Sequence, residues 1–280
     1  MQARPARRAA AVSLWNHLQE GVNGRGCVSE TKCRARSANP CDPVRALYTT
    51  LAQEPERDFG WDKGRDNAQR LGYDPAWLAQ LPDGVWESAA AVGNPFALDP
   101  INRGETVVDI GCGAGADLCV AALLVGPTGQ AIGLDLTPAM VAKARVNAQQ
   151  AGLSHVTVHE GNIENLPLPS ASTDVVISNG AINLAPDKTR VFREIHRVLR
   201  PGGRLQFADM VRRNSGCEAT TKDGSWADCV AGTLQPEQYI ELLQAAGFRQ
   251  VEFVDWTGYH TAAHTEGATF RAVKVPILTE

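Results

Sequence analysis

Several features that mark other protein classes are missing from this chain of 280 residues. Its longest apolar runs, such as residues 118–125, are far too short to span a bilayer, so we predict no membrane insertion. The formal net charge is only −4, which argues against a broad nucleic-acid-binding surface and predicts no nucleic-acid partner. No HExxH motif, Ser-His-Asp order or carboxylate pair at glycosidase spacing stands out.

The cysteine content argues against a disulfide framework. The chain has 7 cysteines, an odd number, and it is not a small secreted domain. We therefore predict reduced thiols and a cytoplasmic location. Cys27, Cys33 and Cys41 have spacings that match no zinc pattern, and no histidine lies among them, so we predict no metal site.

Three segments of the chain differ in pattern. Residues 1–41 are rich in arginine and lack sustained periodicity, which predicts a disordered tail. Residues 42–97 carry two helix-start signatures, Asp42-Pro43 and Asp74-Pro75, and predict a small helical appendage or lid. Residues 98–280 alternate strands with helices, which predicts an α/β domain with a doubly wound, seven-stranded sheet.

Local signals place the elements of this domain. Pro201-Gly202-Gly203 is a strong stop signal between the third of the expected helices and the fifth strand. The last two strands are expected to form a hairpin with a long loop. The expected strands are 106–110, 130–135, 155–160, 173–179, 204–210, 250–256 and 268–275, and the expected helices are 117–125, 137–151, 187–199 and 236–246.

The most informative segment runs from residue 107 to residue 135. An apolar strand ends at Asp109, a turn with three glycines and a helix follow, and a second apolar strand ends at Asp135. Glycines let the backbone approach a ligand closely, and a carboxylate after the second strand suits a ribose diol. This combination is typical of a site for a nucleotide-like ligand, although a glycine-rich turn of another α/β protein is the open alternative.

The charge of the turn favours one ligand class. Its pattern is D-x-G-x-G-x-G, whereas the dinucleotide pattern G-x-G-x-x-G seats a pyrophosphate on a helix N-terminus. Asp109 would instead face a ligand that carries positive charge. S-adenosylmethionine has a ribose, an adenine, an ammonium and a sulfonium, and the segment resembles the first motif of class I S-adenosylmethionine-dependent methyltransferases. Residues 98–280 are thus the predicted S-adenosylmethionine-binding methyltransferase domain, with a Rossmann-like fold.

The cofactor site is expected beyond the carboxyl ends of the strands. Asp135 is predicted to accept hydrogen bonds from two ribose hydroxyls, and Asp117 to lie in the first helical turn. Asn162 would contact the adenine edge and Ile163 its face, although a turn asparagine and a core isoleucine are equally good interpretations. The predicted cofactor-binding residues are Asp109, Gly111, Gly113, Gly115, Asp135, Leu136, Met140, Asn162, Ile163 and Asn179.

Three further segments carry a more specific resemblance. They are VISNGAINLAPDK (176–188), VFREIHRVLRPGGRLQFADM (191–210) and WADCVAGTL (226–234). Together they resemble the arsenite methyltransferases, and the likeness extends over roughly residues 66–250. The resemblance implies methyl transfer from S-adenosylmethionine to trivalent arsenic or to another small thiophilic acceptor.

Members of that family bind trivalent arsenic through three cysteine thiolates, which suit a thiophilic centre. The positions that match the first two thiolates are Val92 and Gly180 in this chain, and only the third, Cys229, is a cysteine. The resemblance therefore implies a catalytic role for Cys229 and a need for glutathione or another thiol. Cys217 could lend a second protein thiolate.

Two other functions stay open on the sequence. One is a quinone-type or natural-product C- or O-methyltransferase, because the glycine motif is shared with such enzymes. The other is a nucleotide-binding protein without catalysis.

Overall fold

The computed structural model describes residues 41–213 and 232–276, which include a seven-stranded sheet in the order β3-β2-β1-β4-β5-β7-β6. Strand β7 is antiparallel to both of its neighbours, β5 and β6, and the other pairs are parallel. This confirms the predicted doubly wound sheet and its late hairpin. The strands are β1 (Thr106–Ile110), β2 (Gln130–Asp135), β3 (Val156–Glu160), β4 (Thr173–Asn179), β5 (Leu199–Arg212), β6 (Arg249–Trp256) and β7 (Thr265–Val273).

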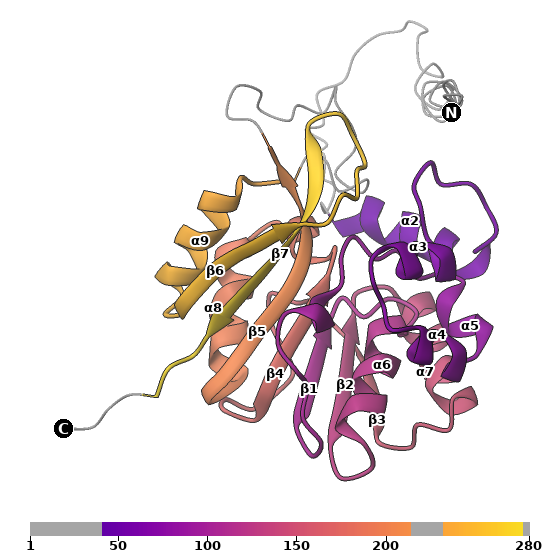
Figure 1. Ribbon diagram of the computed structural model, residues 1–280, viewed down its shortest axis with the longest axis horizontal. Helices are drawn as coiled ribbons and strands as arrows, with labels where there is room; N and C mark the ends of the chain where they lie inside the picture. Colours follow the sequence, from indigo (N-terminus) through magenta and orange to yellow (C-terminus); the bar gives the residue numbers. More distant parts are fainter. Residues whose placement is uncertain (1–40, 214–231, 277–280) are drawn as a thin grey trace, which may run out of the picture.

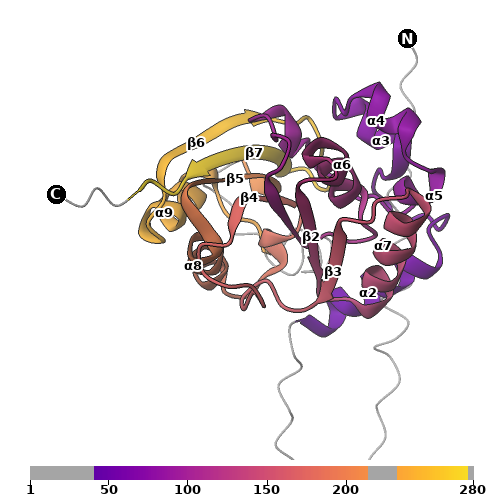
Figure 2. The same cartoon turned by 90° about the horizontal axis from the view of Figure 1, so that it is seen from below.

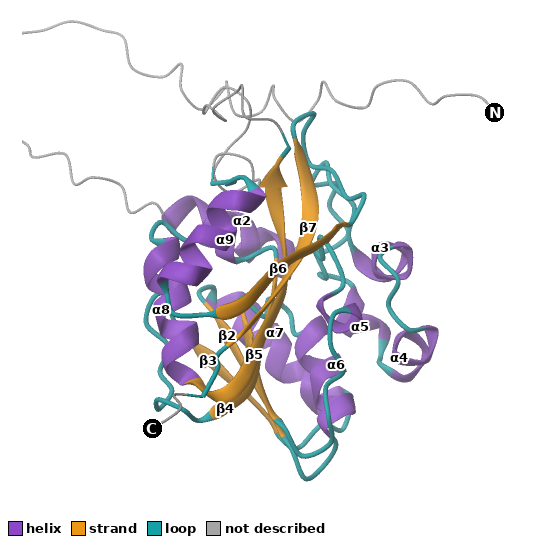
Figure 3. Ribbon diagram, turned by 60° about the vertical axis from the view of Figure 1, so that its left-hand side comes forward, coloured by secondary structure: helices purple, strands orange, loops and turns teal. Residues whose placement is uncertain are grey.

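Helices cover both faces of this sheet. Helices α6 (Ala116–Val125) and α7 (Pro138–Gln150) lie on one side, and α8 (Lys188–Val198) and α9 (Pro236–Ala245) lie on the other (Figure 3). Successive strand residues point to opposite faces, so Val107 packs in the core under α6 and α7 while Val108 packs in the core under α8 and α9. Strands buried on both faces explain the continuous apolar runs in the sequence.

The segment before the sheet is helical. Its elements gather around α6 and α7, as Figures 1 and 2 show. The Asp74 carboxylate accepts a hydrogen bond from the amide of Ala76 at 2.8 Å, which confirms the cap expected there. Cys41, placed in the tail by the sequence, instead belongs to the first described helix. The elements are α2 (Cys41–Gln53), α3 (Gly64–Arg70), α4 (Pro75–Gln80), α5 (Asp83–Trp86) and the 3₁₀ turn η1 (Pro95–Ala97).

The prediction that Pro201-Gly202-Gly203 separates a helix from the fifth strand is wrong, because these residues are part of the strand. Strand β5 begins at Leu199, five residues before the expected start, and runs through these residues. The amide of Gly202 donates to the carbonyl of Lys274 at 2.6 Å, so the segment pairs with the chain after β7. A Cβ on Gly203 would lie 2.9 Å from the carbonyl oxygen of Asp174, which explains the glycine by close backbone approach.

The last strand was also expected too late in the chain. Strand β7 covers Thr265–Val273 rather than 268–275, because its pairing follows β5 to the end, where Arg212 lies opposite Thr265. Among the residues that the structure describes, no helix is both long and apolar enough to cross a membrane.

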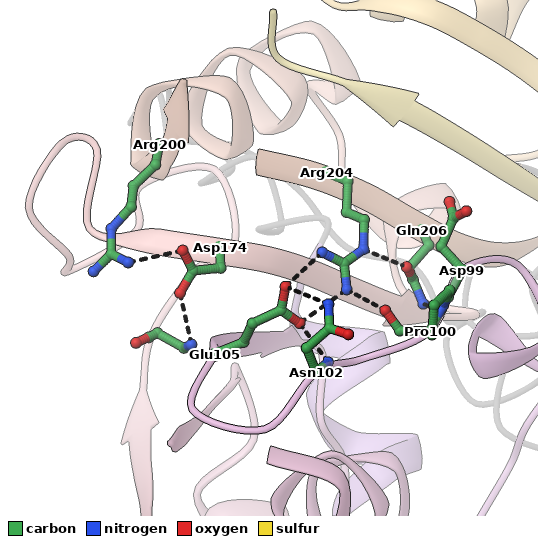
Figure 4. A network of polar contacts seen from close by, with 9 residues as sticks. Asp99, Pro100, Asn102, Glu105, Asp174, Arg200, Arg204 and Gln206 are labelled. Carbon is green, nitrogen blue, oxygen red and sulfur yellow. Dashed lines mark hydrogen bonds and ion pairs between the residues drawn. The ribbon is translucent and has the colours of Figure 1, made fainter. Parts of the chain in front are cut away.

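A polar network joins the segment before the sheet to the amino end of β1 (Figure 4). The Arg204 guanidinium donates to both carboxylate oxygens of Glu105, at 2.9 Å each. The Gln206 side chain donates to the carbonyl of Pro95 at 2.9 Å, which ties η1 to β5. Glu105 directly precedes β1, so these contacts lie at the amino end of that strand, opposite the carboxyl end where ligands bind in sheets of this kind.

Candidate functional site

A cavity of about 1110 Å³, including its open mouth, lies beyond the carboxyl ends of β1, β2 and β4. The loops after these strands form one wall. Helix α2 closes the cavity from the opposite side with Cys41, Val44 and Tyr48.

The glycine-rich turn after β1 has a conformation that favours glycine. Gly111 and Gly113 have φ angles of +73° and +52°. A Cβ on Gly111 would lie 2.2 Å from the Cβ of Ala181, whereas a Cβ on Gly113 would meet nothing within 4 Å. Gly111 thus lets the turn pack against the loop after β4, and Gly113 leaves the cavity open beside the backbone.

The Asp135 carboxylate holds this turn in place. One oxygen accepts from the amide of Gly113 at 2.9 Å, and the other accepts from the amide of Thr137 at 2.8 Å. Burial raises the pKa of Asp135, and these amides lower it in part. Hydrogen bonds from the Thr137 side chain and the Leu136 amide lower this pKa too, so a ribose diol would share the carboxylate oxygens with these donors or replace some of them.

We expect Asp135→Ala to weaken S-adenosylmethionine binding about tenfold or more. A hydrogen bond to a charged group contributes about 1.5–3 kcal/mol, and the variant also frees the Gly113 amide. Calorimetric titration measures the effect. Asp174→Ala is the matched control, because Asp174 accepts from the amide of Thr106 at 2.8 Å outside the cavity lining. Unchanged affinity in Asp135→Ala would show that the carboxylate does not contact the cofactor.

Three carboxylates face the cavity, and no lysine, arginine or histidine of the described chain lines it. Asp109 is 2% exposed, and one of its carboxylate oxygens has no hydrogen-bond partner among the described residues. Burial raises the pKa of Asp109 well above its usual range, and the neighbouring carboxyls of Asp117 and Asp135 raise it further. A cation in the cavity would relieve this cost. The residues therefore fit a cofactor with ammonium and sulfonium charges.

The structure brings nine of the ten predicted cofactor-binding residues to this cavity. Gly115 is the exception: it precedes α6, and a Cβ there would lie 3.1 Å from the Cβ of Ala144. Its place in the motif reflects close packing of α6 on α7. Asn162 also accepts from the amide of Glu164 at 2.9 Å, as a turn asparagine does. The nine lining residues are Asp109, Gly111, Gly113, Asp135, Leu136, Met140, Asn162, Ile163 and Asn179.

Sequence reasoning missed the part of the lining that comes from before the sheet. Tyr73, Trp86 and Tyr48 line the cavity, although no motif marks them. Asp117 does lie in the first turn of α6 as expected, but it is also 8% exposed and part of the lining. Its position two residues after the glycine turn was the available signal.

The two positions that match missing arsenic ligands are adjacent in space. A Cβ on Gly180 would lie 3.3 Å from Cγ1 of Val92, and the amide of Val92 donates to the Asn179 side chain at 2.9 Å. Two side chains at these positions would therefore lie close together, but here neither residue offers a ligand atom. Gly180 lines the cavity, whereas Val92 is buried and is not one of the lining residues. Cys217 and Cys229 lie outside the described residues.

A family model and two similar known proteins point to the same family. A model of a methyltransferase domain matches residues 101–247. An arsenite methyltransferase of Halobacterium salinarum is 42% identical over 224 residues, which are 75% of this chain and 57% of that protein. An arsenite methyltransferase of Aquipseudomonas alcaligenes is 34% identical over 191 residues, 65% of this chain and 55% of that protein.

A solved structure extends the likeness to three dimensions. It is an arsenic(III) S-adenosylmethionine methyltransferase from Chlamydomonas reinhardtii, with 30% identity, a TM-score of 0.60 and coverage of 74% of each chain. The chain spans only somewhat more than half the length of the two relatives named above.

Proposed function

This chain belongs to the arsenite methyltransferase family, and from that premise we propose that it transfers a methyl group from S-adenosylmethionine to trivalent arsenic or another small thiophilic acceptor. The observation that carries the cofactor half is the cavity with three carboxylates, no cationic lining residue and a glycine turn open to a ligand. The proposed acceptor rests on the family resemblance and on the match of Val92 and Gly180 to the family's arsenic-binding positions.

S-adenosylmethionine, when bound, supplies a methyl group activated by its sulfonium. The residues of the chain then bind and orient rather than transfer protons. Asp109 and Asp117 would hold the cationic end of the cofactor, and Asp135 would accept hydrogen bonds from the ribose hydroxyls. Asn179 lines the cavity next to Gly180, where the acceptor would bind. Leu136, Met140 and Ile163 supply apolar contacts, and Asn162 a polar contact, around the adenine.

The acceptor is held in part by thiols from outside the chain. Val92 and Gly180 offer no ligand atom, so Cys229 is the remaining family position with a thiolate. Glutathione or another small thiol supplies the other sulfurs around the arsenic. Because Cys229 lies outside the described residues, this role rests on the motif W-x-x-C-x-x-G alone.

One observation favours a second candidate function. The cavity lining around Gly180 is apolar, with Ala181 and Leu184 where relatives of this family would bind a metalloid, and the buried Val92 packs against Gly180. Such a wall suits a small organic acceptor, for example a quinol, which is methylated on carbon or oxygen.

The experiment that separates these functions is an acceptor screen with purified protein and cofactor labelled on its methyl group. The acceptors are arsenite with glutathione, arsenite alone and a quinol. Label transfer to arsenite that depends on glutathione supports the proposal. Transfer to the quinol alone would replace it with the second candidate. Cofactor binding without transfer to any acceptor would favour a non-catalytic nucleotide-binding protein.

We also propose the cytoplasm as the site of action. Cys112 and Cys119 form no disulfide, which suits a reducing compartment. Burial raises the pKa of Cys112 well above its usual range and that of Cys119 to about 12, so neither is a ready nucleophile for arsenic. Residues 42–97 act in this proposal as a helical cover over the cofactor.

A further inference from the structure

A buried hydrogen-bonded group links the cofactor cavity to the turn that carries Val92. The Tyr73 hydroxyl donates to one carboxylate oxygen of Asp117 at 2.6 Å, and the Asn179 side-chain amide donates to the other at 2.9 Å. The same amide donates to the carbonyl of Gly93 at 2.9 Å, and its carbonyl oxygen accepts from the amide of Val92. Four separate segments of the chain therefore meet around Asn179.

The hydrogen bonds of this group suit an ionised Asp117. The Tyr73 hydroxyl has one proton to donate and the Asn179 amide has two. The Tyr73 oxygen also lies 3.0 Å from the Asn179 amide nitrogen and 3.3 Å from the carbonyl oxygen of Gly93. When Tyr73 and Asn179 both donate to Asp117, each of its carboxylate oxygens accepts a hydrogen bond. Burial raises the pKa of Asp117, and the hydrogen bonds from Tyr73 and Asn179 lower it in part.

Two further contacts hold the Val92–Gly93 turn in place. The Thr257 hydroxyl donates to the carbonyl of Val92 at 2.6 Å from the other side. A Cβ on Gly93 would lie 2.6 Å from the Cβ of Ala208, so the turn packs directly on β5. Asp117 lines the cavity at the far end of the same network.

We propose that Tyr73 and Asn179 are positioning residues: they hold the Asp117 carboxylate toward the bound cofactor, and they fix to this carboxylate the Val92–Gly93 turn, which packs against Gly180 of the cavity lining. This inference rests on the proposed function for its cofactor, but it does not depend on which acceptor is methylated. Tyr73 comes from the loop between α3 and α4, outside the sheet domain, so the segment before the sheet is part of the site.

The pH dependence of cofactor binding tests this role. The titratable groups that face Asp117 are Tyr73 and Asp109, and Asp109 in turn faces Asp135. Burial and Asp117 raise the pKa of Tyr73 well above its usual range, so it stays a donor. Loss of the tyrosine hydroxyl removes a hydrogen bond that lowers the pKa of Asp117. The variant must then reach a higher pH before Asp117 ionises and attracts the cofactor.

We expect Tyr73→Phe to weaken S-adenosylmethionine binding about tenfold at neutral pH and to move the acidic limb of the affinity profile to higher pH. Calorimetric titration over a pH series measures both effects. The phenylalanine ring keeps the edge-on packing that Tyr73 makes with Trp77, Trp86 and Phe96, so the variant should fold. Asp117→Asn is a second variant, and it should lose the part of the acidic limb that Asp117 contributes.

Tyr239→Phe is the matched control. The Tyr239 hydroxyl donates to the buried Asp209 carboxylate at 3.2 Å, and neither residue lines the cavity. Burial raises the pKa of Asp209 to about 7, so this pair is also buried and titratable. The control should leave the affinity profile where it is in the unmodified protein. Asp109 titrates in all of these proteins, so the difference between variants isolates Asp117.

Hydrogen exchange tests the link to the turn. Bound cofactor should slow exchange of the Val92 amide in the unmodified protein, and Tyr73→Phe should remove most of that protection. An unshifted profile in Tyr73→Phe, or an equal shift in Tyr239→Phe, would overturn this inference while the proposed function stands. No cofactor binding by the unmodified protein would refute both.

Discussion

Replacing Cys229 by serine is expected to abolish methylation of arsenite. Holding a reactant in place accounts for roughly 7–11 kcal/mol of barrier lowering in well-oriented reactions. With Val92 and Gly180 at two of the three family positions, arsenic is held by Cys229 and at most one further protein thiol. Turnover by the unmodified protein should therefore be weak or dependent on added thiol, and nothing should remain without Cys229. Chromatographic detection of methylated arsenic measures this.

Installing Val92→Cys and Gly180→Cys together should raise the rate and reduce its dependence on added thiol. The pair is needed because Gly180 has a φ of +69°, and a Cβ there would lie 3.3 Å from Val92 Cγ1. Cysteine in place of valine removes one branch of that neighbour. The backbone strain at position 180 costs about 1–2 kcal/mol of stability.

Val92→Ser with Gly180→Ser is the control for the double variant. It has the same strain and nearly the same size, but a hydroxyl is a poor ligand for a thiophilic centre. A gain with cysteine and not with serine would support the assignment of both positions. Efficient turnover of arsenite without added thiol in the unmodified protein, retained in Cys229→Ser, would show that the acceptor site lies elsewhere.

Gly111→Ala is expected to destabilise the protein by about 2–5 kcal/mol. A left-handed backbone costs a residue with a Cβ about 1–2 kcal/mol, and overpacking costs about 1–3 kcal/mol more. Both apply at Gly111, where φ is +73° and the new Cβ would lie 2.2 Å from the Cβ of Ala181. Urea unfolding followed by circular dichroism measures the loss.

Gly113→Ala separates the two causes. Its φ of +52° brings the same kind of strain, but no atom lies within 4 Å of the new Cβ. We expect a loss of only about 1–2 kcal/mol, together with weaker cofactor binding, because the new Cβ would occupy open space beside the cavity rather than contact Ala181. Equal stability losses in the two variants would mean that the contact between Gly111 and Ala181 relaxes at no cost.

The elements of the sheet domain could be predicted because their signals are local. Continuous apolar runs, proline at the first helical position and an aspartate cap at Asp187 can each be recognised from a few adjacent residues. The errors arose where pairing overrode such signals. Pro201-Gly202-Gly203 carries a stop signal, yet it joins β5 because Gly202 meets the backbone of Lys274.

The residues of the candidate site also fall into two groups, those that a local sequence pattern predicts and those that only the fold brings together. The sequence by itself determined the glycine turn, Asp109 and Asp135, because a close backbone approach and a carboxylate after a strand need particular residues at fixed spacing. Only the tertiary structure decided that Tyr73, Asp117 and Asn179 meet. Tyr73 lies 44 residues and Asn179 62 residues from Asp117 along the chain, so no local pattern records their contact. Hydrogen bonds between such distant residues follow from how the helices before β1 pack on the sheet domain.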